Sequence, residues 1–318
     1  MEVLSNTAAG KAHGKIILIG EHAVVHNEPA IAIPFTSATV EVMIEKTLGE
    51  STMDSIYHYG KLSDAPKQIK NLITTFEEVC AYFNVATDNF HITIRSDIPA
   101  ERGMGSSAAV ATAVVRALFN FFDTELTDDL LHRFVSISEK IAHGNPSGLD
   151  AKVVSSDEAI YFVKEKRADP FEIDLPAYLV VADTGDEGET LGAVADVGKL
   201  VADTTSNGRQ LVQELGDLTE RVYTIIEQKE LIQLGSILDE AQVKLKQLTV
   251  SNDKLDLLVT TAKKSGALGA KLTGGGRGGC MIALVDTAEK AQKVANDLTS
   301  AGATETWIHF LGANNYGK

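Results

Sequence analysis

The sequence predicts an α+β protein made of two domains. Its 318 residues suffice for two hydrophobic cores. After a candidate boundary at residues 167–170, a buried strand pattern restarts at 178–183. Helical periodicity then runs over 189–265, and a strand, a glycine loop, a second strand, a helix and a last strand follow. This order favours a small, mostly antiparallel sheet under helices. We therefore expect an N-terminal domain of residues 1–172 and a C-terminal domain of residues 173–318.

The individual elements follow from the spacing of apolar residues. Short apolar or alternating runs predict strands, and apolar residues three and four apart predict helices. Residues 51–61 are polar and predict a hairpin or a loop. The predicted strands are 16–19, 29–33, 38–45, 90–95, 178–183, two within 269–284, and 305–310. The predicted helices are 68–83, 107–122, 128–142, 288–298 and a run within 189–265, broken near Gly208, Gly216, Lys229 and residues 251–252.

The composition is acidic and disfavours several classes of partner. The 29 basic and 44 acidic residues give a formal net charge of -15, which argues against nonspecific nucleic-acid binding and against an anionic membrane surface. No apolar run reaches the length of about 18 residues that a membrane helix needs. The chain starts without a signal-peptide pattern, and its two cysteines, Cys80 and Cys280, form no disulfide framework. We therefore expect a cytoplasmic protein.

A glycine-rich loop that runs into an alanine-rich helix predicts a phosphate site at residues 99–109. Glycines in the loop permit positive φ and let a ligand approach the main chain. The serine pair favours a helix start, where N–H groups and the helix dipole attract an anion. The candidate phosphate-binding residues are Gly103, Met104, Gly105, Ser106, Ser107 and Ala108.

Two other phosphate motifs fit this sequence poorly. The P-loop pattern G-x-x-x-x-G-K-[ST] does not occur. The dinucleotide pattern G-x-G-x-x-G/A matches residues 103–108 in form, but the strand before it alternates apolar and polar residues and is seven residues away. A second formal match, at residues 274–279, lies in a strand–loop–strand with five glycines in six residues. Such a loop lets another main chain or a ligand come close.

Several polar residues admit both an ordinary and a functional interpretation. Lys15 precedes a strand, and Glu21 and His22 follow it, as solvated flanks and turns often do. Glu139 falls at the border between the apolar and polar faces of its helix. The turn at residues 143–150 fixes where its last residue, Asp150, points, either as a helix cap or as a carboxylate held for chemistry.

Three glycine-bearing segments, residues 14–25, 99–109 and 271–280, resemble in order the three motifs of the GHMP kinase superfamily. Within it, residues 20–26 and 143–150 resemble the mevalonate kinases, whereas phosphomevalonate kinases typically carry Tyr where His22 stands. The resemblance implies a two-domain GHMP kinase fold, with an N-terminal ribosomal-protein-S5-like βαβ domain and a C-terminal ferredoxin-like antiparallel sheet with helices. It also implies phosphorylation of the 5-hydroxyl of mevalonate by ATP and Mg²⁺, a step of isoprenoid precursor synthesis.

The same resemblance implies roles for single residues. The loop of residues 103–108 would cradle the ATP phosphates, and Ser107 and Glu139 would hold Mg²⁺. Asp150 would accept the proton of the substrate hydroxyl or orient that hydroxyl, and Lys15 would lie beside it and help keep it ionised. The implied substrate contacts are Glu21, His22 and Thr190, and the third motif includes Thr273, Gly274, Gly275 and Gly276.

The sequence also departs from the family and leaves alternatives open. Arg277 stands in the third motif where the family often has only alanine or glycine, and it either touches a phosphate or faces solvent. The chain is shorter than the animal mevalonate kinases, which suggests a bacterial or archaeal-like form. The other functions considered are another GHMP kinase such as phosphomevalonate kinase, a catalytically silent sensor on this fold, and an NAD-dependent oxidoreductase. The oligomeric state, including a homodimer, is left open.

Overall fold

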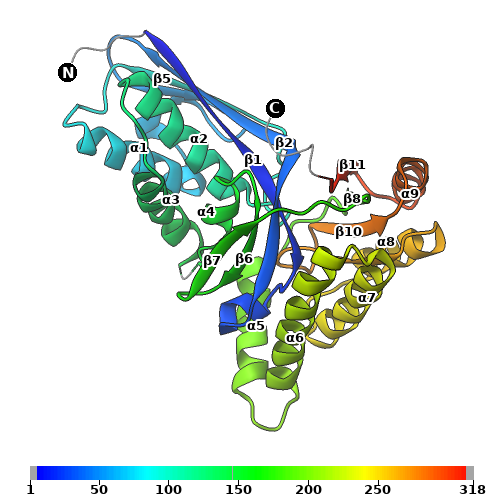
Figure 1. Cartoon of the computed structure of the whole chain (residues 1–318). Coiled ribbons are helices and arrows are strands. Elements are labelled where there is room, and N and C mark those ends of the chain that lie inside the picture. Colours follow the sequence, from blue (N-terminus) through cyan, green and yellow to red (C-terminus); the bar gives the residue numbers. More distant parts are fainter. Residues whose placement is uncertain (1–5, 145, 313–318) are drawn as a thin grey trace. The chain divides into compact units, whose positions relative to one another are not determined.

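The computed structural model describes residues 6–144 and 146–312, which fall into two compact units (Figure 1). Of the described residues, unit 1 holds those up to 14 together with 38–99 and 105–155. Unit 2 holds 15–37, 100–104 and those from 156 onward. Both units combine strands with helices, which confirms the predicted α+β class. The predicted domain division after residue 172 stays a prediction.

The sheet of unit 1 is built on two long strands that the chain continues into unit 2, β1 (Thr7–Ile19) and β2 (Ala30–Lys46). Residues 40–46 of β2 pair antiparallel with β5 (Phe90–Ser96). Next to β5 lies the short hairpin of β3 (Thr52–Asp54) and β4 (Tyr59–Lys61), in which β3 runs parallel to β5. The hairpin confirms the prediction for residues 51–61.

Helices α1 (Lys70–Tyr82), α2 (Ser106–Phe121) and α3 (Asp128–His143) pack on one another in unit 1, and the short α4 (Leu149–Val153) follows them. The alanines at the start of α2 are fully buried, and small residues permit this close packing. At Gly10 of β1 an added Cβ would lie 2.2 Å from the carbonyl oxygen of Ala113, so α2 lies directly against this strand. This packing fixes the N-terminus of α2, where the glycine-rich loop ends.

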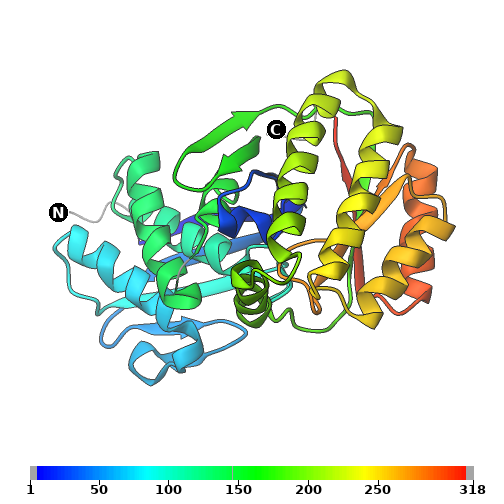
Figure 2. The same cartoon turned by 90° about the horizontal axis from the view of Figure 1, so that it is seen from below.

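Unit 2 contains a four-stranded antiparallel sheet in the order β11-β8-β10-β9, as the sequence predicts. Its strands are β8 (Tyr178–Asp183), β9 (Gly269–Leu272), β10 (Cys280–Val285) and β11 (Glu305–Phe310). Figure 2 shows helices alongside this sheet, and α7, α8 and α9 contact its strands. The helices are α5 (Thr190–Ala202), α6 (Gly208–Gln228), α7 (Leu231–Gln247), α8 (Asp253–Lys264) and α9 (Ala288–Ser300).

The N-terminal part of β2 also belongs to unit 2. There residues 30–32 pair antiparallel with β6 (Ala159–Val163), which pairs with β7 (Arg167–Phe171). The short helix η1 (Ala23–His26) connects β1 to this region, and η2 (Leu62–Asp64) and η3 (Lys67–Ile69) precede α1 in unit 1.

Three predictions of element boundaries are wrong. The strand predicted at 16–19 is only the C-terminal part of β1, which begins at Thr7. The strands expected at 29–33 and 38–45 form the single strand β2, because Pro34 lies between the stretches that pair with β6 and with β5 and so removes no donor from either ladder. The break expected near Gly216 does not occur, since Gly216 lies inside α6. An added Cβ there would lie 2.4 Å from a carboxylate oxygen of Glu28, so this glycine serves close packing and does not end the helix.

Candidate active site

The predicted phosphate loop changes unit in its middle. Residues 100–104 belong to unit 2, whereas Gly105 and the start of α2 belong to unit 1. In unit 2 the main-chain N–H of Lys15 donates to the carbonyl of Met104 at 2.9 Å, so the first and second motifs are hydrogen-bonded. An added Cβ at Gly103 would lie 3.1 Å from Cα of Gly274, which brings the third motif against the loop as well.

Helix α2 begins at Ser106 with Gly105 as its N-cap, and no side chain caps it. The prediction that a serine caps this helix is therefore wrong, because Gly105 occupies the cap position with φ 72°. The first N–H groups of an α-helix have no partner within the helix, and an anion can satisfy them. An uncapped N-terminus after a glycine loop is the local geometry that the phosphate prediction requires.

The proposed metal ligands Ser107 and Glu139 lie in unit 1, and Asn71, which the sequence does not single out, bonds to Ser107 and to the residue before Glu139. Asn71 of α1 donates its side-chain amide to Ser107 Oγ at 3.3 Å and to Ser138 Oγ at 2.9 Å. Ser107 lies on α2, and Ser138 lies on α3 directly before Glu139. The buried amide of Asn71 therefore connects α2 to α3 next to the two proposed ligands. The available signal was a polar residue on the apolar side of a predicted helix.

Glu139 is not a border residue, as the helical spacing predicts, but is buried, with 4% of its surface exposed. Helix α3 packs on α1 and α2, and periodicity within one helix does not reveal such neighbours. His143 Nε2, one turn further along α3, lies 3.9 Å from a carboxylate oxygen of Glu139. Because Mg²⁺ prefers a few oxygen ligands and retains several waters, Ser107 and Glu139 fit it in chemistry. No group of three or more His, Cys, Asp or Glu side chains with metal-binding geometry occurs among the described residues.

Asp150 lies on the second residue of α4 in unit 1. The N-cap of that helix is Gly148, with φ 87° and no side-chain cap, so Asp150 is not the helix cap that the ordinary interpretation supposes. Ser147 Oγ accepts a hydrogen bond from the N–H of Leu149 and shapes the turn before it. Asn145, part of the same motif, lies outside the described residues.

The first motif forms a strained turn in unit 2. The N–H of Ala23 donates to the carbonyl of Glu21 at 2.6 Å, and His22 between them has φ 61° and ψ -41°. These values define a γ-turn with positive φ, a rare and strained conformation that is found at functional sites. Lys15, on β1 before this turn, is 2% exposed, so the predicted solvated strand flank is instead a buried lysine.

Alternate residues of the third motif hold the first motif in place. Lys271 forms a buried ion pair with Glu21 Oε1. Thr273 Oγ1 donates to the carbonyl of Ile17 at 2.9 Å and accepts from its N–H at 3.2 Å. The carbonyl of Gly275 lies 3.0 Å from His22 Nε2. Residues 271, 273 and 275 of one segment thus contact residues 17, 21 and 22 of the other.

The ionisable groups of this turn are shifted by burial. Burial lowers the pKa of His22 to about 4, so its ring is neutral at pH 7. A neutral ring that donates from Nε2 to Gly275 has an acceptor at Nδ1. Burial also raises the pKa of Glu21, while the ammonium of Lys271 and the charge of Lys15 oppose this rise. Among the described residues, neither Glu21 Oε2 nor His22 Nδ1 has a hydrogen-bond partner. A buried polar atom without a partner costs about 1–3 kcal/mol.

The glycines of the third motif are explained by close contacts inside unit 2. An added Cβ at Gly275 would lie 2.3 Å from Oγ1 of Thr190, the first residue of α5, and one at Gly276 would lie 2.0 Å from the carbonyl oxygen of Val250. Thr190, predicted as a substrate contact, is therefore brought against the third motif. Arg277 donates to Asp196 at 2.9 Å and to the carbonyl of Thr249 at 3.2 Å. That it touches a phosphate or faces solvent stays a prediction.

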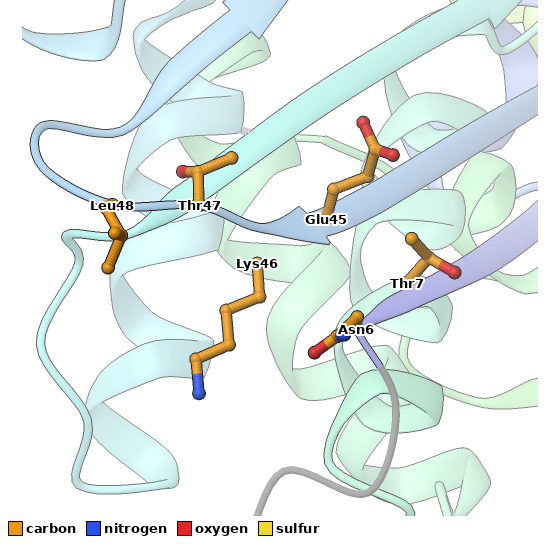
Figure 3. A pocket seen from close by; sticks show the side chains of 6 residues that line it. All are labelled: Asn6, Thr7, Glu45, Lys46, Thr47 and Leu48. Atoms are coloured by element: carbon orange, nitrogen blue, oxygen red, sulfur yellow. The ribbon is translucent and has the colours of Figure 1, made fainter.

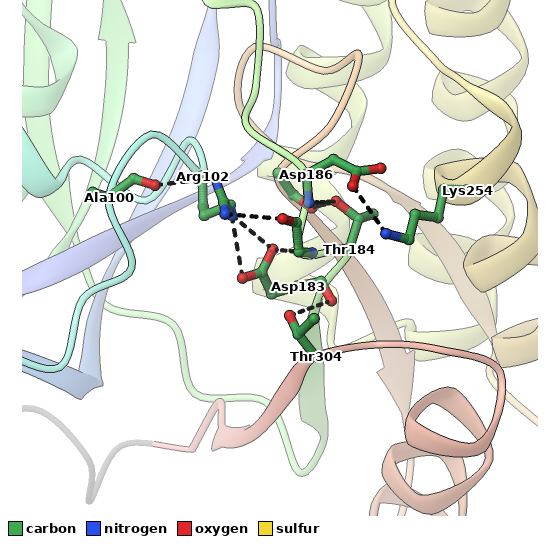
Figure 4. A network of polar contacts seen from close by, with 9 residues as sticks. Ala100, Arg102, Asp183, Thr184, Asp186, Lys254 and Thr304 are labelled. Carbon is green, nitrogen blue, oxygen red and sulfur yellow. Dashed lines mark hydrogen bonds and ion pairs between the residues drawn. The ribbon is translucent and has the colours of Figure 1, made fainter.

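Arg102 anchors the first half of the phosphate loop, a role that the sequence analysis missed. Its guanidinium contacts the Asp183 carboxylate at 3.2 Å and donates to the carbonyls of Ala100 and Gly185 at 3.3 and 3.0 Å (Figure 4). The same carboxylate accepts a hydrogen bond from the main-chain N–H of Gly185 at 2.9 Å. The Arg102–Asp183 clasp, as we name this ion pair, ties the loop to the end of β8.

Other features of the described residues lie apart from these candidates. A surface pocket in unit 1 is lined by Asn6, Thr7, Glu45, Lys46, Thr47 and Leu48, none of which was predicted to act (Figure 3). No helix in the described part of the chain has both the length and the apolar character needed to traverse a lipid bilayer. Both cysteines are buried thiols.

Comparison with known proteins gives the chain its family. Residues 69–156 match the GHMP kinases N terminal domain, and residues 225–304 match the GHMP kinases C terminal domain. A mevalonate kinase of Pyrococcus abyssi is 32% identical over 92% of each chain. The crystal structure of mevalonate kinase from methicillin-resistant Staphylococcus aureus MRSA252 is similar with a TM-score of 0.73 and 35% identity, over 97% of this chain and all of that one.

The fold extends to more distant proteins. L. major mevalonate kinase in complex with R-mevalonate has a TM-score of 0.84 over 98% of this chain and 99% of that one, at 24% identity, a likeness of fold alone. The two domain matches and the identity over nine-tenths of the chain agree with the three motifs that the structure brings together. The chain belongs to the GHMP kinase family.

Proposed function

We propose that the protein is a mevalonate kinase, which transfers the γ-phosphoryl group of ATP to the 5-hydroxyl of mevalonate and yields 5-phosphomevalonate. The observation that carries the proposal is the hydrogen-bonded connection of the first and third motifs in unit 2, around Glu21 and His22. These two residues belong to the motif that resembles mevalonate kinases. The similarity to mevalonate kinases over nine-tenths of the chain supports the same choice of substrate.

Phosphoryl transfer needs positioning and neutralisation of charge more than covalent help from the protein. The uncapped N-terminus of α2 supports binding of the ATP phosphates by main-chain N–H groups of residues 103–108. Ser107 Oγ and the carboxylate of Glu139 would hold Mg²⁺, and the Asn71 amide would orient the serine. When bound, Mg²⁺ neutralises charge on the β- and γ-phosphates.

Asp150 and Lys15 are the proposed catalytic residues. We assign Asp150 to accept the proton of the substrate hydroxyl or to orient it, and Lys15 to stabilise negative charge on the transferring group. The position of Asp150 in the first turn of α4, without a capping role, supports a task other than capping this helix. Glu21, His22 and Thr190 are the proposed contacts to mevalonate. We further propose that the protein works in the cytoplasm, which suits its two free thiols.

The proposal is tested by ADP release in a screen over mevalonate, phosphomevalonate, homoserine and galactose. We expect the largest kcat/KM with mevalonate. A higher kcat/KM with phosphomevalonate would replace the substrate and leave the kinase assignment standing. ADP release with none of the four alcohols, together with binding of mevalonate in calorimetry, would favour a silent sensor.

A further inference from the structure

The proposed function does not explain why Lys271 and Glu21 form a buried ion pair. Lys271 has no exposed surface and Glu21 has 1%. The ammonium of Lys271 contacts Glu21 Oε1 and also donates to the carbonyl of Leu272 at 2.7 Å. Replacing a buried ion pair with apolar side chains is often neutral or stabilising, so stability alone is a weak reason for two buried charges.

The second oxygen of the carboxylate indicates what the pair serves. Oε2 of Glu21 is buried and has no hydrogen-bond partner among the described residues. On the next residue, His22 Nδ1 is also buried and also has no hydrogen-bond partner among the described residues. It is an acceptor, because the ring is neutral and its Nε2 faces the carbonyl of Gly275. Two adjacent acceptors without a donor call for a ligand that donates hydrogen bonds.

The chemistry of the substrate narrows the donor, if the proposed function holds. Mevalonate carries a carboxylate, a primary hydroxyl at C5 and a tertiary hydroxyl at C3. The carboxylate cannot donate and is repelled by an ionised Glu21. In the proposed reaction Asp150 accepts the proton of the 5-hydroxyl or orients that hydroxyl, so the 3-hydroxyl is the remaining donor.

We propose that Lys271 is a positioning residue, which keeps Glu21 ionised and oriented so that Oε2 accepts a hydrogen bond from the 3-hydroxyl of mevalonate. Lys271 acts through Glu21 and does not touch the substrate. The pair thereby contributes to selection of a substrate that carries this hydroxyl. This inference rests on the proposed function and adds to it a residue outside the predicted site.

The pH profile separates positioning from a purely structural role. Burial raises the pKa of Glu21, Lys271 on β9 lowers it most strongly, and Lys15 on β1 lowers it less; neutral His22 follows on the chain. Lys271→Met removes the contact that lowers the pKa of Glu21 most and leaves the carboxylate buried, so this pKa rises further. We expect the acid limb of kcat/KM for mevalonate to move up by at least about one pH unit, with activity recovered toward high pH and an unchanged KM for ATP.

A second variant avoids an unpaired buried charge. The double variant Glu21→Met/Lys271→Met replaces both charges with apolar side chains of similar length. We expect the wild type to prefer mevalonate over 3-deoxymevalonate by about 30-fold, the size of a hydrogen bond to a charged group. In the double variant this preference should fall below about threefold. The matched control is Glu214→Met/Lys244→Met, an ion pair at 2.6 Å between α6 and α7, which should retain the wild-type preference.

The outcomes distinguish the inference from the function on which it rests. A wild type that does not phosphorylate mevalonate overturns the proposed function and this inference with it. A wild type active on mevalonate, with the same preference in Glu21→Met/Lys271→Met, overturns the inference alone. An unshifted acid limb in folded Lys271→Met does so as well.

Discussion

Asp150 and Glu139 have the same charge but differ in what their surroundings permit. Glu139 lies on α3, which packs on α1 and α2, and only 4% of its surface is exposed. Asp150 is half-buried on the five-residue helix α4, which begins after Gly148 with positive φ, so part of its surface is left for a substrate.

We predict that Asp150→Asn lowers kcat on the order of 10²-fold or more, because an amide cannot accept the proton. ATP affinity and the melting temperature should stay near the wild-type values, since Asp150 is only half-buried and is not a helix cap. The measurement is steady-state kcat with calorimetric ATP titration. The exposed Asp157→Asn, a few residues further along the chain, is the control. If Asp150→Asn kept more than about a tenth of wild-type kcat, a proton-accepting role of this size would be wrong.

Single residues also show what the sequence alone cannot predict. The glycines and the residues at positions 15, 21, 22, 139 and 150 stood out because their motifs are local in the chain. Asn71, Arg102 and Lys271 did not, because each acts through a partner that is distant in sequence, as in the contact of Lys271 with Glu21. Burial of Lys15 and Glu139 was missed for the same reason: a neighbouring element covers them, and one element's periodicity contains no information about it.

Among the elements, amphipathic helices and buried strands were the most predictable. The helices predicted at 128–142 and 288–298 match α3 and α9 closely, and the strand at 305–310 matches β11. The failures occur where tertiary contact overrides a local signal. Gly216 looks like a break but lies under Glu28 inside α6, and Pro34 interrupts the alternation without interrupting β2. Glycine and proline report a local conformational freedom or restriction and not the element that uses it.

The loop of residues 100–104 depends on the Arg102–Asp183 clasp for its place against β8. Arg102 is 16% and Asp183 7% exposed in their side chains, so the ion pair is shielded from solvent. Arginine donates in several directions from one planar group, which lysine cannot do. We predict that Arg102→Lys raises KM for ATP about tenfold, the loss of roughly one charge-assisted hydrogen bond, and leaves KM for mevalonate within about twofold of wild type.

The control for this prediction lies in the same network. Lys254 pairs with Asp186 at 2.9 Å on the exposed side (Figure 4), so Lys254→Met should leave KM for ATP unchanged. Initial-rate kinetics with varied ATP and varied mevalonate measure both constants. A lower melting temperature of Arg102→Lys with a wild-type KM for ATP would show that the clasp serves stability only.

At the scale of the whole molecule, an acidic chain is proposed to bind two anionic substrates. The net charge of -15 repels ATP and mevalonate at a distance. Cationic groups near the motifs must therefore act locally. Lys15 is almost completely buried in unit 2, whereas the charge of Lys271 is paired with Glu21. A divalent cation that accompanies ATP would reduce the same repulsion, so the Mg²⁺ requirement is a property of the whole charge distribution as well as of its ligands.

Thermal unfolding gives a test of that metal at the level of the whole protein. A ligand that binds only the native state stabilises it by about 2.7 kcal/mol at 100 times its Kd, which corresponds to a rise in melting temperature of roughly 4 °C for a chain of this size. We predict such a rise for a nonhydrolysable ATP analogue with Mg²⁺, and a much smaller one with EDTA. In Glu139→Gln the difference between Mg²⁺ and EDTA should fall to less than about half, because the amide is a weaker ligand for a hard cation.

Glu139 is buried in the protein without ligand. Its replacement can change the stability of the unliganded protein, so each variant's shift is measured against its own melting temperature without ligand. Asp129→Asn alters an exposed carboxylate in the first turn of the same helix and should keep the full Mg²⁺-dependent shift. If Glu139→Gln also kept the full shift, Glu139 would not be a metal ligand, and its buried carboxylate would have to be explained by packing of α3 against α1 and α2.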